Sequence, residues 1–435
     1  MIVPLLLAAA LGLQDTTRLT LADAVRRALE SHPTVAAARD NRAAAEASVG
    51  EARAPLFPRL TAGFSATQYK IGNLIYPLSG ISLTNLPAFN STLSQASLSL
   101  GYTLFDFGGR TSQLRLAQAQ ERKADAALDA ASAALISRVA NAYLRVLTTR
   151  GVLQAQEQEL AALEAESRRV AQMEDQGKAA HVEVLRLAAQ ASRARADEVG
   201  TRAQLDVAER DLAQLVALPV EIARTQLAPV RLADTTMADR ATLVASAEQN
   251  SPDVAQARRT AEAAGAGVGV AQASLLPQLQ LVAAYVENGH SFTGYRPWWN
   301  AGLQLSYPIF TGGSRGSAIR RNEADERSAA EQLRSAEQAS ELSVDGALAT
   351  VAAARATVDA LVSAVAQSEE VERIRLLSVQ VGSGTETDYL DAEATLLSNR
   401  AALVQARHAE IAARVELARV TGVLTPELLT RMVSQ

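Results

Sequence analysis

The 435-residue chain contains an internal repeat, and this repeat limits the fold more than any other feature of the sequence. Glu30-Ser31-His32-Pro33 recurs 219 positions later as Gln249-Asn250-Ser251-Pro252. Tyr102-Thr103-Leu104-Phe105 recurs only 205 positions later, as Tyr307-Pro308-Ile309-Phe310. The extra residues of the first half therefore lie between positions 69 and 102. We expect two halves of one design, 15–218 and 240–422, and an exposed loop in the first half, at about 72–92.

Each half devotes most of its length to helical sequence. A short helix is expected near 21–31 and near 241–249, and a second helix follows in each half, with Pro33 or Pro252 in its first turn. Later in each half, helical sequence runs without interruption from a glycine pair to the next glycine, over about 68 residues, or on the order of 100 Å at 1.5 Å per residue. Apolar residues there follow the three- and four-residue steps of a coiled coil. This pattern predicts long helical hairpins at 109–217 and 313–421, which turn at Gly177 and at Gly382 to Gly384.

Between the helical segments the hydrophobic period changes to two. Apolar and small polar residues alternate at about 58–70, 95–106, 278–287 and 298–310. Alternation over roughly 9 to 11 residues is typical of membrane β-barrel strands, and the aromatic residues near the strand ends favour this interpretation over a soluble sheet. Four strands do not close a barrel, because the smallest membrane barrels have about eight. Three copies of the chain would supply twelve, so the sequence predicts a homotrimer.

The remaining composition restricts location and partners. Residues 1–14 are apolar and contain the small-residue stretch Ala8-Ala9-Ala10, as in a signal peptide, and no later helix is expected to span a membrane. The chain has no Cys and a net charge of −5, which argues against disulfides, thiolate metal sites and nucleic-acid binding. Residues 219–239 are expected to link the halves around the outside of the helices, and 423–435 to form a C-terminal tail.

Three segments carry a resemblance to a known family. Val381-Gly382-Ser383-Gly384-Thr385-Glu386-Thr387-Asp388-Tyr389-Leu390-Asp391-Ala392 is similar to the periplasmic helix–turn–helix tip of the TolC-type outer-membrane efflux proteins. The segments ending in Gly108-Gly109 and Gly312-Gly313 resemble the strand–helix junctions of that family. The resemblance implies a mainly α fold with a transmembrane β-barrel: a trimer whose 12-stranded β-barrel is continuous with a 12-helix periplasmic α-barrel. It also implies an outer membrane location in contact with lipid, a periplasmic adaptor and an inner-membrane pump as partners, and passive export.

The clearest candidate site residues are Asp388 and Asp391. They are three residues apart at the start of a helix, so they share a face. In a trimer they would form two acidic rings, which favour cations and are blocked by multivalent ones. The resemblance places both on gate positions, whereas the structural alternative is that they cap the helix and complement its dipole. Glu183, near the equivalent first-half position, is a further candidate, and Gly384 stands where some family members have a latch Arg.

No other chemistry is indicated by the sequence. The histidines lack the paired spacing of metal ligands, and no nucleophile, base and orienting group form a catalytic motif, so we expect no metal, no cofactor and no enzyme activity. A periplasmic coiled-coil scaffold or adaptor is the alternative function, because it would share the Ala-rich hairpins. The sequence leaves open the exported substrate and the choice between drug or metal efflux and polypeptide secretion.

Overall fold

A computed structural model of the chain describes residues 18–69, 91–225, 227–233, 237–290 and 292–434. The expected signal peptide and most of the loop at 72–92 lie outside these residues. The chain divides into two compact units. One comprises 1–40, 125–256 and 334–435, and the other comprises 41–124 and 257–333. Each is described by itself below.

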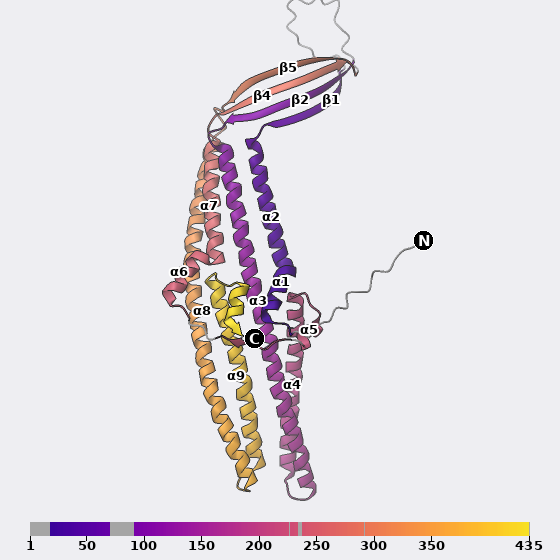
Figure 1. The fold of residues 1–435 in the computed structure, drawn as a ribbon, viewed down its shortest axis with the longest axis vertical. Helices are drawn as coiled ribbons and strands as arrows, with labels where there is room; N and C mark the ends of the chain where they lie inside the picture. The colour runs from indigo at the N-terminus through magenta and orange to yellow at the C-terminus, as the bar shows by residue number, and fades with distance from the viewer. Residues whose placement is uncertain (1–17, 70–90, 226, 234–236, 291, 435) are drawn as a thin grey trace, which may run out of the picture. The chain divides into compact units, whose positions relative to one another are not determined.

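The second unit contains a four-stranded antiparallel sheet with strand order β1-β2-β4-β5 (Figure 1). Its strands are β1 (Arg59–Tyr69), β2 (Ser91–Phe105), β4 (Gln278–His290) and β5 (Thr293–Ser306). Each half of the chain supplies two neighbouring strands. The outer strands β1 and β5 each pair on one side only, so the sheet of one chain is open at both edges.

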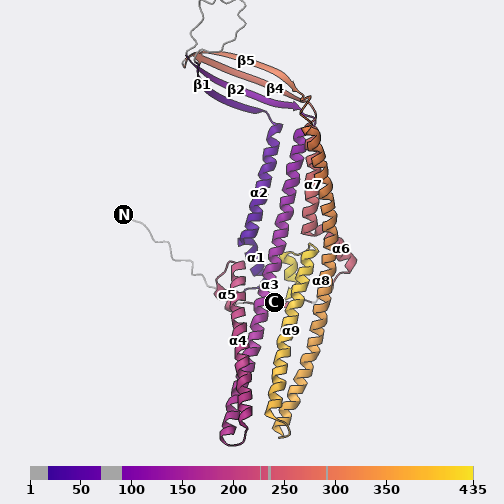
Figure 2. The same ribbon diagram turned by 180° about the vertical axis from the view of Figure 1, so that it is seen from behind.

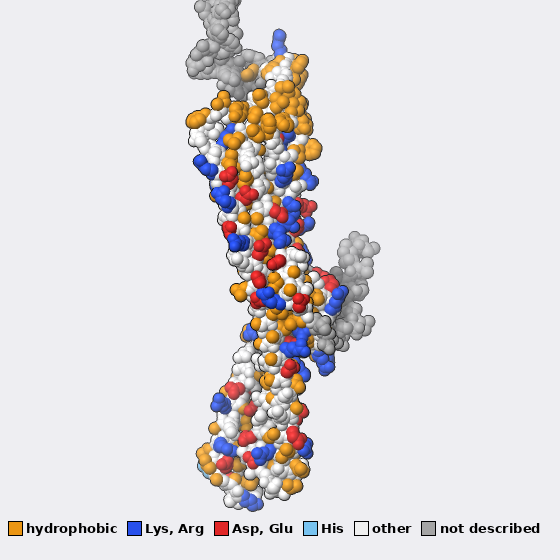
Figure 3. Space-filling view, turned by 90° about the vertical axis from the view of Figure 1, so that its left-hand side faces the viewer, with side chains coloured by type: hydrophobic (Ala, Val, Ile, Leu, Met, Phe, Trp, Pro, Cys, Tyr) orange, Lys and Arg blue, Asp and Glu red, His pale blue; other side chains and the backbone are white. Residues whose placement is uncertain are grey.

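The strand register separates apolar from polar residues across the sheet. Leu98 pairs with Tyr285, which pairs with Trp299, and Leu60 pairs with Leu100 on the same face. The other face carries small and polar residues, such as the row formed by Thr61, Ser99, Ala284 and Asn300. The apolar face is exposed in the single chain, and Trp299 is 74% exposed. Hydrophobic side chains gather over these strands in Figure 3. One apolar and one polar face is the arrangement that a barrel wall in lipid requires.

The ends of β5 differ from the predicted bounds. The alternation predicts a strand at 298–310, whereas β5 begins at Thr293 and ends at Ser306. Pro308 follows this end and has no backbone N–H for a ladder hydrogen bond, which explains why the strand does not continue. Pro297 lies within β5, opposite Glu287 of β4.

The α-helices of the two halves correspond in order, and three of the four pairs have equal lengths. The first half contains α1 (Leu21–Ser31), α2 (Pro33–Arg53), the short 3-10 helix η1 (Ala54–Leu56), α3 (Gly109–Asp175) and α4 (His181–Leu215). The second half contains α6 (Arg240–Asn250), α7 (Pro252–Ala273), α8 (Ser314–Gln380) and α9 (Glu386–Val420). In both halves the long hairpin pairs a 67-residue helix with a 35-residue helix. The two hairpin turns lie at the same end of the first unit (Figure 2).

The main core of the first unit surrounds the middle of α3. Tyr143 is fully buried there, and its hydroxyl lies 2.7 Å from both the Leu19 and the Ala228 carbonyl oxygens. These contacts hold the segment before α1 and the inter-repeat linker against α3. Because a phenol has one proton, it donates to one carbonyl at a time. The Leu19 carbonyl also accepts from the Ala228 N–H at 3.0 Å, whereas the Ala228 carbonyl accepts only from the hydroxyl among the hydrogen bonds of the described residues.

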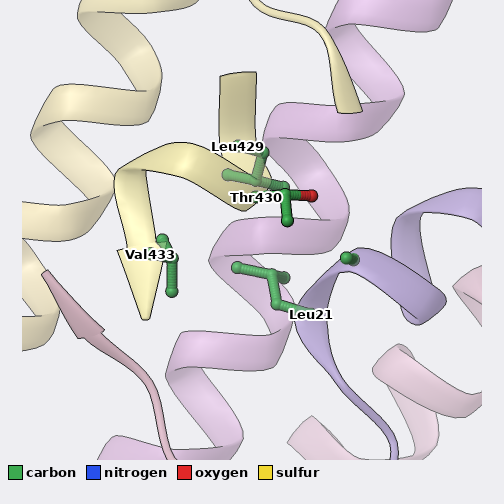
Figure 4. A pocket seen from close by; sticks show the side chains of 5 residues that line it. Leu21, Leu429, Thr430 and Val433 are labelled. Atoms are coloured by element: carbon green, nitrogen blue, oxygen red, sulfur yellow. The ribbon is translucent and has the colours of Figure 1, made fainter. Parts of the chain in front are cut away.

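The linker and the C-terminal tail also carry regular structure. The linker contains α5 (Val220–Thr225) and β3 (Arg231–Leu232), and the tail contains α10 (Pro426–Met432) and β6 (Val433–Ser434). β3 and β6 pair as antiparallel strands. A small pocket of about 160 Å³ lies between α1 and the tail and is lined mainly by apolar side chains, with Leu21 facing Leu429 and Val433 (Figure 4). The linker and the tail thus each contain a short helix followed by a short strand.

One helix departs from the expectation that no helix is apolar enough to cross a membrane. By length and composition, α8 contains a window of mean hydropathy 1.5 that satisfies this criterion, and 6% of the window is buried within the chain. Ala, Val and Leu dominate residues 346–366 and raise the mean hydropathy of this stretch. Its surface is nevertheless not exclusively apolar. A face this exposed in one chain is available for packing against another chain.

Candidate functional site

The second hairpin turns over five residues, from Val381 to Thr385, between α8 and α9. Gly382 has φ +76°, and its N–H donates to the Val379 carbonyl at 3.0 Å. The N–H groups of Ser383 and Gly384 both donate to the Ser378 carbonyl at 2.9 Å. A Cβ at position 384 would lie 2.8 Å from the Ser378 Cβ and 3.2 Å from its carbonyl carbon. Glycine is therefore required at 384, which explains the absence of an Arg at this point of the turn.

The two candidate gate carboxylates occupy the first turns of α9. The Thr385 side chain accepts a hydrogen bond from the Asp388 N–H at 3.2 Å, so this threonine caps the helix. Asp388 and Asp391 are both exposed. Arg375 of α8 places its Nη1 3.8 Å from the Asp388 Oδ2, across the hairpin. The sequence pattern did not single out Arg375, because only the register of α8 against α9 brings position 375 next to 388.

A second acidic feature lies two residues beyond Asp391 on α9, at Glu393. The pKa of the Glu393 carboxyl is raised, first by partial burial and second by the nearby charge of Glu372. Both effects disfavour a further negative charge. The second hairpin thus concentrates carboxylates near its tip beyond the pair identified from the sequence.

The first hairpin is built differently. Gly177 (φ +71°) forms its turn, and the His181 Nδ1 lies 2.7 Å from the Glu174 Oε1 across that turn. Glu183, the third candidate carboxylate, lies 3.3 Å from the Arg186 Nε on the same helix. Glu183 therefore has its own cation, one turn away, whereas Asp391 has no ion-pair partner among the described residues.

The four junction glycines fall where the chain passes from strand to helix. Gly108, Gly312 and Gly313 have φ between +62° and +90°, which glycine adopts without strain. Gly109 begins α3, and a Cβ there would lie 3.3 Å from the Asp106 Oδ2. That oxygen accepts hydrogen bonds from the Arg110 N–H and Nε, at 2.8 and 3.1 Å. In the first half, a buried carboxylate thus fixes the junction.

A metal site would need several ligating side chains to converge. Within the described ranges, no group of three or more His, Asp or Glu side chains is arranged to hold a metal ion.

Comparisons with known proteins agree with this architecture. The sequence profile described as outer membrane efflux protein matches residues 24–218 and 243–423, most of both halves. The chain is 28% identical to the outer membrane protein TolC of Salmonella enteritidis, over 91% of this chain and 80% of TolC. It is 29% identical to protein CyaE of Bordetella pertussis over 88% and 79% of the two chains. It is 27% identical to the pyoverdine export outer membrane protein OpmQ of Pseudomonas aeruginosa over 92% and 84%.

Solved structures show the same fold. The outer membrane protein VceC from Vibrio cholerae matches with a TM-score of 0.76 and 22% identity, over 92% of this chain and 96% of VceC. The CmeC outer membrane channel of Campylobacter jejuni matches with a TM-score of 0.79 and 16% identity, over 92% and 85%. The expected fold, a β-barrel combined with a helical barrel, is therefore confirmed, and the family match supports an outer membrane export channel rather than the scaffold or adaptor alternative. The chain therefore belongs to the outer membrane efflux protein family.

Proposed function

We propose that three copies of this chain form the outer-membrane exit duct of a tripartite efflux or type I secretion system, gated at the periplasmic tip by Asp388 and Asp391. The duct itself is the function of the family, and it requires no catalytic residue. The gate at Asp388 and Asp391 is the more specific part of this proposal. It is supported by one observation: two carboxylates, three residues apart, are both exposed at the first turns of α9, beside the hairpin turn.

Charge balance at the tip favours this gate over a capping role alone. Capping is performed by the Thr385 side chain, which accepts from the Asp388 N–H and leaves the carboxylate of Asp388 free of that task. Arg375 offsets Asp388 in part, at 3.8 Å between exposed groups. Asp391 is not offset by a described partner, so each chain adds net negative charge to the mouth. Three chains then make an acidic ring that attracts cations and is blocked by multivalent ones.

The partners follow from the same proposal. A periplasmic adaptor would contact the two hairpin tips, and an inner-membrane pump would deliver the solute through it. Among the relatives, OpmQ is named for pyoverdine export and another, ArpC of Pseudomonas putida, for antibiotic efflux. The relatives' names thus refer to different exported compounds. The tip residues do not indicate which class of compound this chain exports.

Single-channel recording in planar bilayers tests the gate. The wild-type protein is expected to conduct with cation preference and to be blocked by a multivalent cation, hexaamminecobalt, added on the tip side. Asp388→Ala/Asp391→Ala is expected to weaken this block by at least about tenfold, since two rings of three charges are removed. Arg375→Ala is expected to strengthen it, because Asp388 loses its offsetting cation.

Glu183→Ala provides the matched control at the other tip. It removes one carboxylate that already has a cation 3.3 Å away, so its effect on block should be small. Equal block in the wild type and in the double variant would remove the gate assignment and leave the duct. A purified protein that forms no pore would contradict the duct itself.

A further inference from the structure

A narrow exposed stripe runs along the middle of α3. Between Ala133 and Val146, four residues are exposed and the other residues are buried. The exposed residues are Ala134, Arg138, Asn141 and Arg145. Their spacing of four, three and four residues places them in one line along the helix. They line a hollow of about 420 Å³ together with Asp211 of α4 and Arg419 of α9.

The other sides of this segment are all covered by named elements. α4 lies along one flank, where the Arg150 Nη2 donates to the Glu209 Oε1 at 3.0 Å. α9 lies along another flank, where Thr148 and His408 are joined by a 2.7 Å hydrogen bond. The segment before α1 and the linker cover a third side through Tyr143.

The uncovered stripe faces away from Tyr143. At 3.6 residues per turn, Asn141 and Arg145 lie about 160° around the helix from Tyr143, and Arg138 about 140°. In a barrel of helices, each helix has two neighbours, an outer side and an inner side. The layer of short helices and linker is the outer one, because three copies of it inside would obstruct the duct. The stripe is therefore the inner side of α3, which faces the passing solute.

The charges on this inner surface do not cancel. Arg419 forms an ion pair with Glu416, with the Nη2 2.6 Å from the Oε1. Arg138 and Arg145 have no ion-pair partner among the described residues, and Asp211 is the one unpaired carboxylate that lines the hollow. Arg138 and Arg145 thus share one unpaired carboxylate, Asp211, whereas Arg419 is balanced by Glu416 and by the nearby charge of Asp253.

We propose that Arg138, Arg145 and Arg419 form a basic belt inside the duct that binds the anionic groups of passing solutes, carboxylates and phosphates above all. This inference rests on the proposed function, because it requires the three chains to surround one passage. Guanidinium groups suit these ligands, since their planar donors match both carboxylate and phosphate oxygens. The belt favours solutes that carry a negative charge, whereas the acidic tip favours positive ones.

The α3 part of the belt, Arg138 and Arg145, has no charged equivalent in the second half of the chain. At the offset of 205, the positions of Arg138, Asn141 and Arg145 correspond to Ser343, Gly346 and Thr350, which are exposed and uncharged. The carboxylate of Asp211, in contrast, is repeated as Glu416. The equivalent positions of the second half are therefore suitable for the addition of positive charge, and they show that uncharged residues are compatible with this part of the fold.

Bilayer recording at about 0.1 M KCl, where screening acts over about 10 Å, tests the belt. Inorganic tripolyphosphate is the probe. The wild-type pore is expected to be blocked by it, and Arg138→Gln/Arg145→Gln to weaken this block by about tenfold, the change that ~1.4 kcal/mol of binding free energy produces. The reversal potential in a KCl gradient should shift toward cation preference in the same variant. Arg138→Lys/Arg145→Lys keeps the charge and should retain the reversal potential of the wild type.

Two further variants keep the test decisive. Arg26→Gln/Arg27→Gln removes the same charge from the exposed surface of α1 and should leave block unchanged. Ser343→Arg/Thr350→Arg adds the belt to the second half and should tighten block, which provides a readout if the first variant assembles poorly. A conducting pore with unaltered tripolyphosphate block in both belt variants would overturn the belt but not the duct. A wild-type protein without any pore would refute the proposed function instead.

Discussion

Replacement of Gly422 by alanine should separate α9 from the junction between α6 and α7. Gly422 ends the turn after α9 with φ +72°. An added Cβ would lie 2.1 Å from the Asn250 carbonyl oxygen, 2.2 Å from its carbonyl carbon and 2.7 Å from the Ser251 nitrogen. All three atoms belong to backbone, so no side-chain rotation relieves the contact.

The cost has two parts. An alanine at positive φ is destabilised by about 1–2 kcal/mol. Ordinary contact begins near 3.4 Å, so the backbones must also move apart by about 1 Å, and overpacking of this kind costs about 1–3 kcal/mol. The expected loss in the free energy of local opening is therefore about 2–5 kcal/mol. It should be centred on the Ser251 N–H, which donates to the Ala247 carbonyl at 2.9 Å.

Hydrogen–deuterium exchange on the detergent-solubilised trimer measures this loss. Gly177→Ala is the matched control, because Gly177 has nearly the same φ, +71°, with no atom within 4 Å of the added Cβ. The control should show only the cost of the backbone conformation, at its own hairpin tip. Faster exchange around Ser251 in Gly422→Ala is the expected outcome. Equal effects of the two variants on local opening would refute the argument from close approach.

Three further predictions follow from single residues of the first unit. Ala217, the first-half equivalent of Gly422, has φ +51°, so Ala217→Gly should raise trimer stability by about 0.5–1 kcal/mol; a lower thermal midpoint would contradict this. Tyr143→Phe should cost about 1–3 kcal/mol, because the buried Ala228 carbonyl loses its donor and the Leu19 carbonyl keeps only the Ala228 N–H, and the Ala228 amide should exchange faster; unchanged exchange would contradict this. Burial lowers the pKa of His408 below its usual 6.5, so the unfolded state takes up the proton first as the pH falls. Stability should therefore be constant above about pH 6.5 and should fall below it. Melting curves of His408→Gln should show a weaker pH dependence than those of the wild type, and an identical dependence would contradict this prediction.

The fold was accessible from the sequence because the repeat and two hydrophobic periods agree. Glycine pairs and prolines mark the element ends, so positions such as Pro33 and Pro252 begin helices where the pattern predicts them. The tail was not recognised as structured, because α10 has seven residues and β6 has two, too few for any period to be visible. The end of β5 was placed four residues too far, since Tyr307 and Ile309 continue the alternation although Pro308 interrupts the hydrogen bonding.

The candidate site was only partly accessible. Asp388 and Asp391 are neighbours in sequence, so their shared face follows from helical spacing. Arg375 comes near Asp388 through hairpin register, and Arg138 and Arg419 line one hollow through packing of two helices from different halves. Neither of these proximities is visible as a pattern of neighbouring residues in the sequence. The gate role of Asp388 and Asp391 stays a prediction until the recordings described above are made.

The matched lengths of the two hairpins limit how a chain of this design can change. A seven-residue insertion into both α3 and α4 would extend the first tip by about 10 Å and leave the second behind. Any protein that seals against the six tips of a trimer would then meet a ring of alternating heights and leak. Length changes are therefore tolerated only when all four long helices change together. Comparison of chain lengths among relatives should show steps shared by both halves, rather than insertions scattered at random.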